Sequence, residues 1–171
     1  ENIFNKIRNE EWVQNDQIDL AESYGQRASD LSEELLDELE REEDSIFSNG
    51  TQPYKKRALL SLLSINASSN LSIGNSKLLI AKRKHNSEQK KQSNRFFRMA
   101  LRDQQKYLKY ADPGSQQYLP TFLSHADALS QLLTNERNLT DEDKTILDQS
   151  LVLLDKFGKD HIWDEKRFID L

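Results

Sequence analysis

The side chains that could carry out chemistry are few in this sequence, and their spacing matches no common metal site. The three histidines, His85, His125 and His161, lie far apart, and none has a second histidine or a glutamate at the spacing of common zinc or di-iron sites. The absence of cysteine excludes thiolate ligands, a cysteine nucleophile and disulfide bonds. We therefore expect no metal site.

Motifs for nucleophilic catalysis and for nucleotide binding are also missing. Ser124 and His125 are neighbours in the sequence, but adjacency does not make a catalytic pair, because such pairs are defined by their geometry. The five glycines are too dispersed to form a phosphate-binding loop. The many carboxylates between positions 16 and 44 are typical of a solvated helix face. The sequence therefore predicts a protein that is not an enzyme, with no catalytic residues and no cofactor.

The composition favours a helical protein. Of the 171 residues, 36% are hydrophobic and 31% are charged, which is typical of long helices with much solvated surface. Only five Gly and three Pro are present, and no segment alternates as a strand would. The longest mainly apolar run, residues 58–65, is far shorter than the about 20 residues that span a bilayer. We expect an all-α fold, an elongated antiparallel bundle of about six to seven helices with one long acidic helix and one long basic helix, and no membrane partner. The sequence leaves the cellular location open and slightly favours an intracellular one.

The N-terminal part, residues 1–50, is predicted to be an acidic amphipathic helical segment. A short helix is expected over residues 1–13 and a long one over residues 17–47, with Gly25 weakening the latter by about 1 kcal/mol. The apolar residues of the long helix recur mainly every three or four positions, a narrow seam of the coiled-coil type. We expect this predicted seam to bind a protein partner through Leu20, Tyr24, Leu31, Leu35, Leu39 and Ile46.

Residues 51–171 are predicted to form the main helical domain. A buried helix should follow Pro53. Residues 66–75, rich in Ser and Asn, suggest a loop, with a continued and loosely wound helix as the alternative. Ser76 would then cap a new helix. Residues 112–114 indicate a turn, and Thr140 with Asp143 resembles a capping box. The expected core is Leu59, Leu62, Leu63, Phe97, Leu101, Leu129, Leu132, Leu147, Leu151 and Leu154.

Charge is divided unevenly along the chain. Residues 77–109 contain eleven Lys and Arg against two acidic residues, a net charge of +9, whereas the whole chain carries −5. Residues 82–95 contain no hydrophobic residue, so they should form either a solvated helix between two packed ends or a flexible linker. The residues in this region that we expect to bind a nucleic acid or an acidic partner are Lys82, Arg83, Lys84, Lys90, Lys91, Arg95, Arg98 and Arg102.

Three interpretations of this charge division remain open. The basic stretch could bind nucleic acid phosphates, although the net negative charge of the chain weighs against a dedicated nucleic-acid domain. It could meet an acidic protein surface, including residues 16–44 of the same chain or of a second copy. Both charged runs could also be solvated helix faces that keep the protein soluble. We predict a non-catalytic protein-interaction or assembly subunit, with nucleic-acid binding through residues 77–109 as the alternative.

Overall fold

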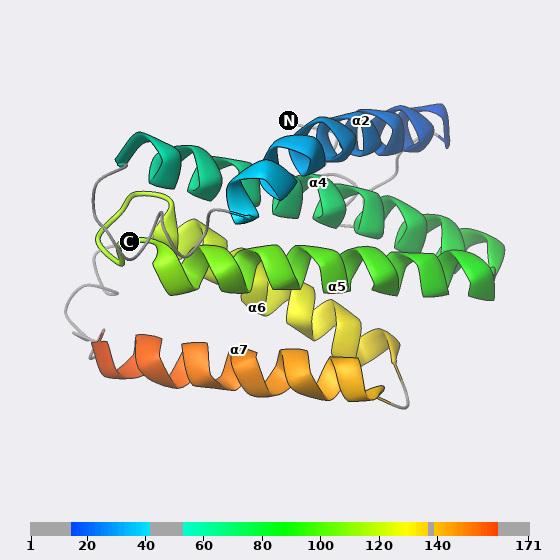
Figure 1. The fold of residues 1–171 in the computed structure, drawn as a ribbon. Helices are drawn as coiled ribbons and strands as arrows, with labels where there is room; N and C mark the ends of the chain where they lie inside the picture. The colour runs from blue at the N-terminus through cyan, green and yellow to red at the C-terminus, as the bar shows by residue number, and fades with distance from the viewer. Residues whose placement is uncertain (1–14, 42–52, 137–138, 161–171) are drawn as a thin grey trace, which may run out of the picture.

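The computed structural model describes residues 15–41, 53–136 and 139–160 of the chain, and these residues form helices without strands. The helices are α2 (Asn15–Glu40), α4 (Pro53–Lys84), α5 (Ser87–Tyr110), α6 (Tyr118–Asn135) and α7 (Asp141–Asp160) (Figure 1). The predicted all-α class is confirmed. The described ranges hold five helices, and the further helices expected near the two ends lie outside them. Within the described part, no helix is long and apolar enough to cross a membrane.

Helix α4 is continuous through the segment expected to be a loop, so that expectation is wrong and the alternative of a continued helix is right. The serines on this segment bond back to the helix. The hydroxyls of Ser68, Ser72 and Ser76 each donate to the carbonyl oxygen four residues earlier, at 2.8 to 2.9 Å. Ser76 is therefore an interior helix residue and not a cap. Tertiary packing overrides the weak helix propensity of Ser and Asn here.

Residues 82–95 are neither one solvated helix nor a linker. They contain the end of α4, a tight turn and the beginning of α5, which together close an antiparallel hairpin (Figure 1). His85 adopts the left-handed conformation with a φ of 48°, a region that His tolerates better than most residues. The Asn86 side chain then caps α5 by accepting from the backbone N–H groups of Glu88 and Gln89. The turn itself is solvated, whereas the polar residues Ser93 and Asn94 at the end of this stretch are buried.

The hairpin of α4 and α5 forms the centre of the molecule. Helix α2 packs on α4, whereas α6 and α7 pack on α5, so the two groups lie on opposite sides of the hairpin (Figure 1). One buried cluster joins Leu59 and Leu63 to Leu108 and Phe122. Another joins Leu78 of α4 and Phe97 of α5 to side chains of α6 and α7. The predicted core residues that are buried are Leu59, Leu63, Phe97, Leu101, Leu129 and Leu132.

The other predicted core residues lie nearer the surface. Leu62, Leu147 and Leu154 are partly buried and pack against the two clusters. Leu151 is 52% exposed, so its assignment to the core is wrong. The inward positions of α7 at this level belong to Ile146 and Ser150, and Leu151 follows Ser150 directly, about 100° further around the helix.

Helix α2 approaches α4 closely because the middle of its inward face is built from small residues. A Cβ atom on Gly25 would lie 2.9 Å from Cγ1 of Ile73 and 3.3 Å from the carbonyl oxygen of Ser69. Both distances are shorter than normal packing allows. Gly25 therefore sets how near the two helices come. The inward residues of α2 are Ile18, Ala21, Gly25, Ser29, Ser32 and Leu36.

Replacing Gly25 by alanine should reduce the free energy of unfolding by about 1 kcal/mol. Overpacking against Ile73 and Ser69 costs about 1–3 kcal/mol, and the better helix propensity of alanine returns about 1 kcal/mol. Urea denaturation measures this difference. Ser23→Ala, at an exposed position of the same helix, is the control and should not be destabilising. A Gly25→Ala protein at least as stable as wild type would contradict the close approach.

Candidate functional site

Four large apolar residues of α2 point away from the bundle. Leu20 is 52% exposed, Tyr24 61%, Leu31 64% and Leu35 52%. At about 100° per residue, these four side chains fall within an arc of about 60° on the helix surface. We call them the outward stripe. Of the other residues in the predicted seam, Leu39 is partly buried against the core, and Ile46 lies outside the described residues.

The same helix thus has an inward face whose middle part, from Ala21 to Ser32, consists of small residues, beside an outward stripe of large ones. The prediction that the large apolar residues form a seam did not specify which face of α2 packs within its own chain. A second signal was present in the sequence. The inward residues, from Ile18 to Leu36, follow one another at steps of three, four, four, three and four positions, which is a regular helical pattern of its own. Because most of these residues are small or polar, a search for large hydrophobic residues does not detect this pattern.

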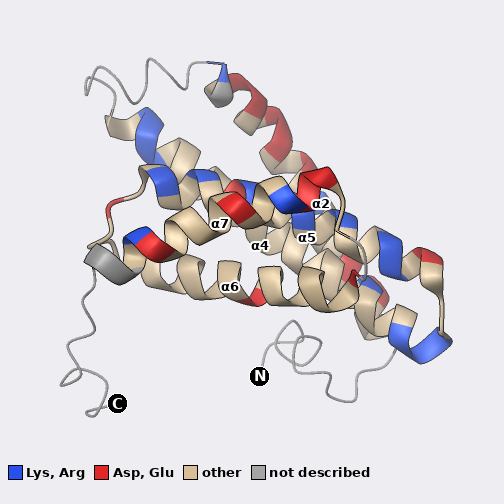
Figure 2. Cartoon of the chain, turned by 90° about the horizontal axis from the view of Figure 1, so that it is seen from below, with Lys and Arg blue, Asp and Glu red and all other residues tan. Residues whose placement is uncertain are grey.

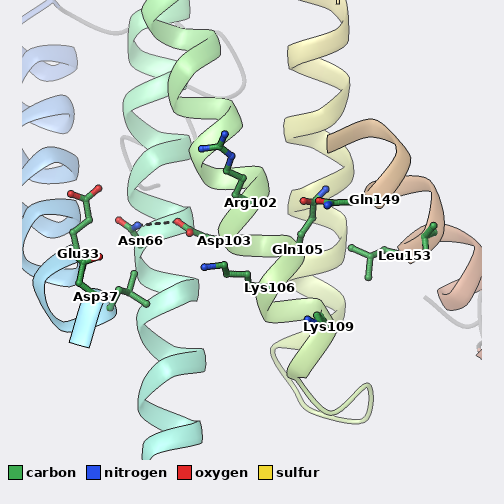
Figure 3. A pocket seen from close by; sticks show the side chains of 12 residues that line it. Glu33, Asp37, Asn66, Arg102, Asp103, Gln105, Lys106, Lys109, Gln149 and Leu153 are labelled. Carbon is green, nitrogen blue, oxygen red and sulfur yellow. Dashed lines mark hydrogen bonds between the residues drawn. The ribbon is translucent and has the colours of Figure 1, made fainter. Parts of the chain in front are cut away.

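A buried hydrogen-bond network fixes the position of α2 on the hairpin. The hydroxyls of Ser29 and Ser32 donate to the Asn66 side-chain oxygen, at 2.8 and 3.2 Å. The Asn66 amide donates in turn to Asp103 on α5, at 2.9 Å (Figure 3). Each hydrogen bond adds only about 0.5–1.5 kcal/mol net, but leaving these groups unpaired would cost more. The network therefore selects one register of α2 and leaves the outward stripe facing solvent.

The charges of the chain are separated in space as well as in sequence. Acidic residues gather on α2, and basic residues gather where α4 meets α5 (Figure 2). Only Arg27 is basic within α2. One ion pair joins the two regions, since the Lys77 ammonium lies 2.6 Å from the Glu22 carboxylate in a partly buried position. Part of the acidic surface of α2 is therefore neutralised by the molecule itself.

The eight predicted basic residues do not form one surface. Lys82, Arg83 and Lys84 are exposed on the last turn of α4, and Lys91 and Arg95 are exposed on α5, with Lys90 partly buried there. Arg98 points inward and lies 2.6 Å from Asp143 and 3.1 Å from Glu136. Arg102 forms an exposed pair with Glu142 at 2.7 Å. Arg98 and Arg102 thus connect α5 to α7, and Arg98 also connects it to Glu136, which directly follows α6.

Asp143 is the buried end of the ion pair with Arg98. Burial by itself would raise the pKa of this carboxyl group, but hydrogen bonds from Arg98 and Thr140 outweigh burial and lower the pKa to about 2. The hydrogen bond to Asp143 likewise raises the pKa of Arg98. The Thr140 hydroxyl accepts from the Asp143 backbone N–H, while the Asp143 carboxylate accepts from the Thr140 backbone N–H. This is the reciprocal pattern of a capping box, as the sequence predicted.

A groove of about 720 Å³ runs between α2, α5 and α7 (Figure 3). Its apolar lining comes from Leu36, Val152 and Leu153. Its charged lining consists of three residues of each sign: Arg102, Lys106 and Lys109, and Glu33, Asp37 and Asp103. Lys106 extends toward the α2 side of the groove in Figure 3. Because its charges balance, the groove does not select strongly for a cation or an anion. It does bring the acidic and basic helices of one molecule face to face.

His125 belongs to a buried hydrogen-bond network whose geometry does not fit a catalytic pair. The Ser150 hydroxyl donates to the Ile146 carbonyl oxygen and accepts from the Gln105 amide. Its only proton is therefore committed, so the His125 Nε2 atom, 2.9 Å away, must be the donor to Ser150. A serine that accepts from histidine is not activated as a nucleophile. Ser124, the sequence neighbour of His125, instead contacts the Gln104 amide. In the described ranges, no three His, Asp or Glu residues are grouped to hold a metal ion.

Comparison of the chain with known protein families, with curated proteins and with solved structures gave no significant match.

Proposed function

We propose that the protein is a non-catalytic protein-interaction or assembly subunit that docks a helix of its partner on the outward stripe of α2. The observation that carries the proposal is the exposure of four large apolar side chains on one face of a helix that is already packed through another face. Isolated exposed leucines are ordinary on protein surfaces, whereas an apolar stripe several turns long is typical of a docking site for a partner helix.

The energetics also favour this surface over the other exposed regions. Burying apolar area contributes about 25 cal/mol per Å², whereas exposed ion pairs contribute only about 0–1 kcal/mol each. The outward stripe can therefore supply binding energy, and the acidic residues beside it can supply selectivity. The groove between α2 and α7 is the weaker site, because its charges already balance within the molecule.

A nucleic-acid-binding function is the second candidate. It is favoured by the exposed cations on both sides of the α4–α5 turn, where Glu88 is the only acidic residue from position 82 to position 95. Such a surface would bind phosphates with strong salt dependence. Two of the eight predicted residues, Arg98 and Arg102, take part in ion pairs with other helices, which reduces the cationic surface available.

A selection from a library of helical peptides with varied surface charge tests the principal function. We expect peptides that bind the wild-type chain and lose at least about tenfold in affinity for the Leu31→Ser/Leu35→Ser variant. Leu119→Ser/Leu123→Ser is the matched control, because these two leucines of α6 have the same spacing and are 48% and 59% exposed. Peptides that bind both variants equally well would contradict docking on α2. Tight binding of a short DNA at low salt, without any stripe-dependent peptide, would favour the second candidate.

A further inference from the structure

We infer that the partner segment is a cationic amphipathic helix that belongs to another protein. This inference rests on the proposed function and adds the chemistry of the partner. Its first support is the length of the outward stripe. From Leu20 to Leu35 the stripe runs for about 22 Å at the helical rise of 1.5 Å per residue. A partner helix of about four turns covers that length.

The second support is the charge beside the stripe. Asp16, Glu34 and Glu38 are exposed, and each lies three or four positions from a leucine of the stripe. The exposed Arg27 has the same spacing from Tyr24 and Leu31, so the charged residues beside the stripe are three acidic and one basic. Residues at this spacing are neighbours on a helix surface. At about 100° per residue, the three carboxylates all lie along one edge of the docking face, like one of the two charged rows that border the seam of a coiled coil and determine which partner pairs with it. The complementary partner carries Lys or Arg beside its own apolar seam.

Charge also argues against a second copy of the chain as the occupant. Two α2 helices packed through their stripes would bring both sets of carboxylates together, and each helix has only Arg27 to oppose them. Like charges that border a seam disfavour pairing. The basic residues of a second copy offer no alternative, because the exposed cations at the α4–α5 turn lie in a stretch without apolar residues that could cover the leucines.

Two designed helical peptides of about three heptads test this inference. Both carry leucine at the a and d positions, and they differ only at the e and g positions, which are Lys in one peptide and Glu in the other. Fluorescence anisotropy with labelled peptide measures affinity for the folded chain at about 50 mM and about 500 mM salt. We expect the Lys peptide to bind at least about tenfold more tightly than the Glu peptide at low salt, with the difference decreasing at high salt.

Two variants separate the stripe from the charge. Leu31→Ser/Leu35→Ser should abolish binding of the Lys peptide, whereas Leu119→Ser/Leu123→Ser should not change it. Glu34→Lys/Glu38→Lys should reverse the preference toward the Glu peptide. All these residues are exposed, so the variants are expected to fold. Circular dichroism is the measurement that checks the folding of each variant.

The outcomes that overturn the inference differ from those that overturn the proposed function. If both peptides bound equally well and both lost binding to Leu31→Ser/Leu35→Ser, the cationic partner would be contradicted. The proposed docking function would not be. Lys-peptide binding that survives Leu31→Ser/Leu35→Ser would show attraction by acidity alone and contradict this site. Failure of both peptides would also overturn the inference. Light scattering that shows a dimer dependent on Leu31 and Leu35 would identify a second copy as the occupant.

Discussion

Replacing Arg98 by methionine is expected to lower the free energy of unfolding by about 3 kcal/mol or more at neutral pH. Methionine keeps much of the packing of the arginine stem but removes the guanidinium from Asp143, whose side chain is fully buried. Removing one partner of a buried ion pair costs about 3–5 kcal/mol, because the remaining charge is left uncompensated. The hydrogen bonds from Thr140 to Asp143 persist, which places the expected loss near the lower end. Urea denaturation measures the change.

Arg102→Met provides the matched control for this experiment. Arg102 lies one turn further along α5, and its pair with Glu142 is exposed, with 57% and 44% of the two side chains accessible. Loss of this ion pair should lower the free energy of unfolding by less than about 1 kcal/mol. The loss of stability caused by Arg98→Met should also decrease as the pH falls toward about 2, where Asp143 takes up a proton in the wild-type protein. Equal losses in both variants would contradict a special role for the buried pair.

The stability of the protein should fall by about 2 kcal/mol between about pH 7.5 and about pH 5 because of His125 alone. Burial lowers the pKa of His125 from 6.5 to about 4. A histidine with a lowered pKa in the folded state contributes its full stability above pH 6.5. That contribution is lost as the pH falls from about 6.5 to about 4, because the unfolded chain takes up the proton first. The His125 Nδ1 atom has no hydrogen-bond partner in the described structure, so a proton there would be buried without an acceptor.

His125→Gln isolates this effect. Glutamine can still donate to the Ser150 hydroxyl but does not titrate, so the stability of the variant should depend less on pH between these two values by about 2 kcal/mol. His85, which is exposed at the α4–α5 turn, supplies the control variant His85→Gln, and its pH profile should follow that of the wild type. A wild-type stability that is flat between pH 7.5 and pH 5 would show that His125 takes up a proton without loss of packing.

The protein distributes its polar and apolar residues in an unusual way. Asn66, Asn70, Gln104, Gln105 and His125 are buried between helices, whereas four large apolar residues of α2 are exposed. Buried hydrogen bonds specify which surfaces meet more than they add net stability. We propose that the polar residues between α2, α4 and α5 set the register of these helices, and that the exposed apolar residues of α2 bind a partner.

Much of the fold was predictable from local patterns. The all-α class follows from the scarcity of Gly and Pro and from helical periodicity. The capping box of Thr140 and Asp143 and the turn after α5 were correctly located, because capping and turn chemistry act over a few residues and need no tertiary context. Most of the expected core leucines are buried for the same reason: they stand on strongly apolar helix faces.

The sequence by itself therefore determined the class of fold, most of the core and the separation of charge. Only the tertiary structure decided that residues 66–75 continue α4, that residues 82–95 close a hairpin, and that α2 packs through Gly25, Ser29 and Ser32. The physical reason is that serine and asparagine are equally suited to a loop and to a buried interface. Their role depends on hydrogen-bond partners that are distant in the sequence. Ser29 and its partner Asn66 are 37 residues apart, and so are Asn66 and its partner Asp103.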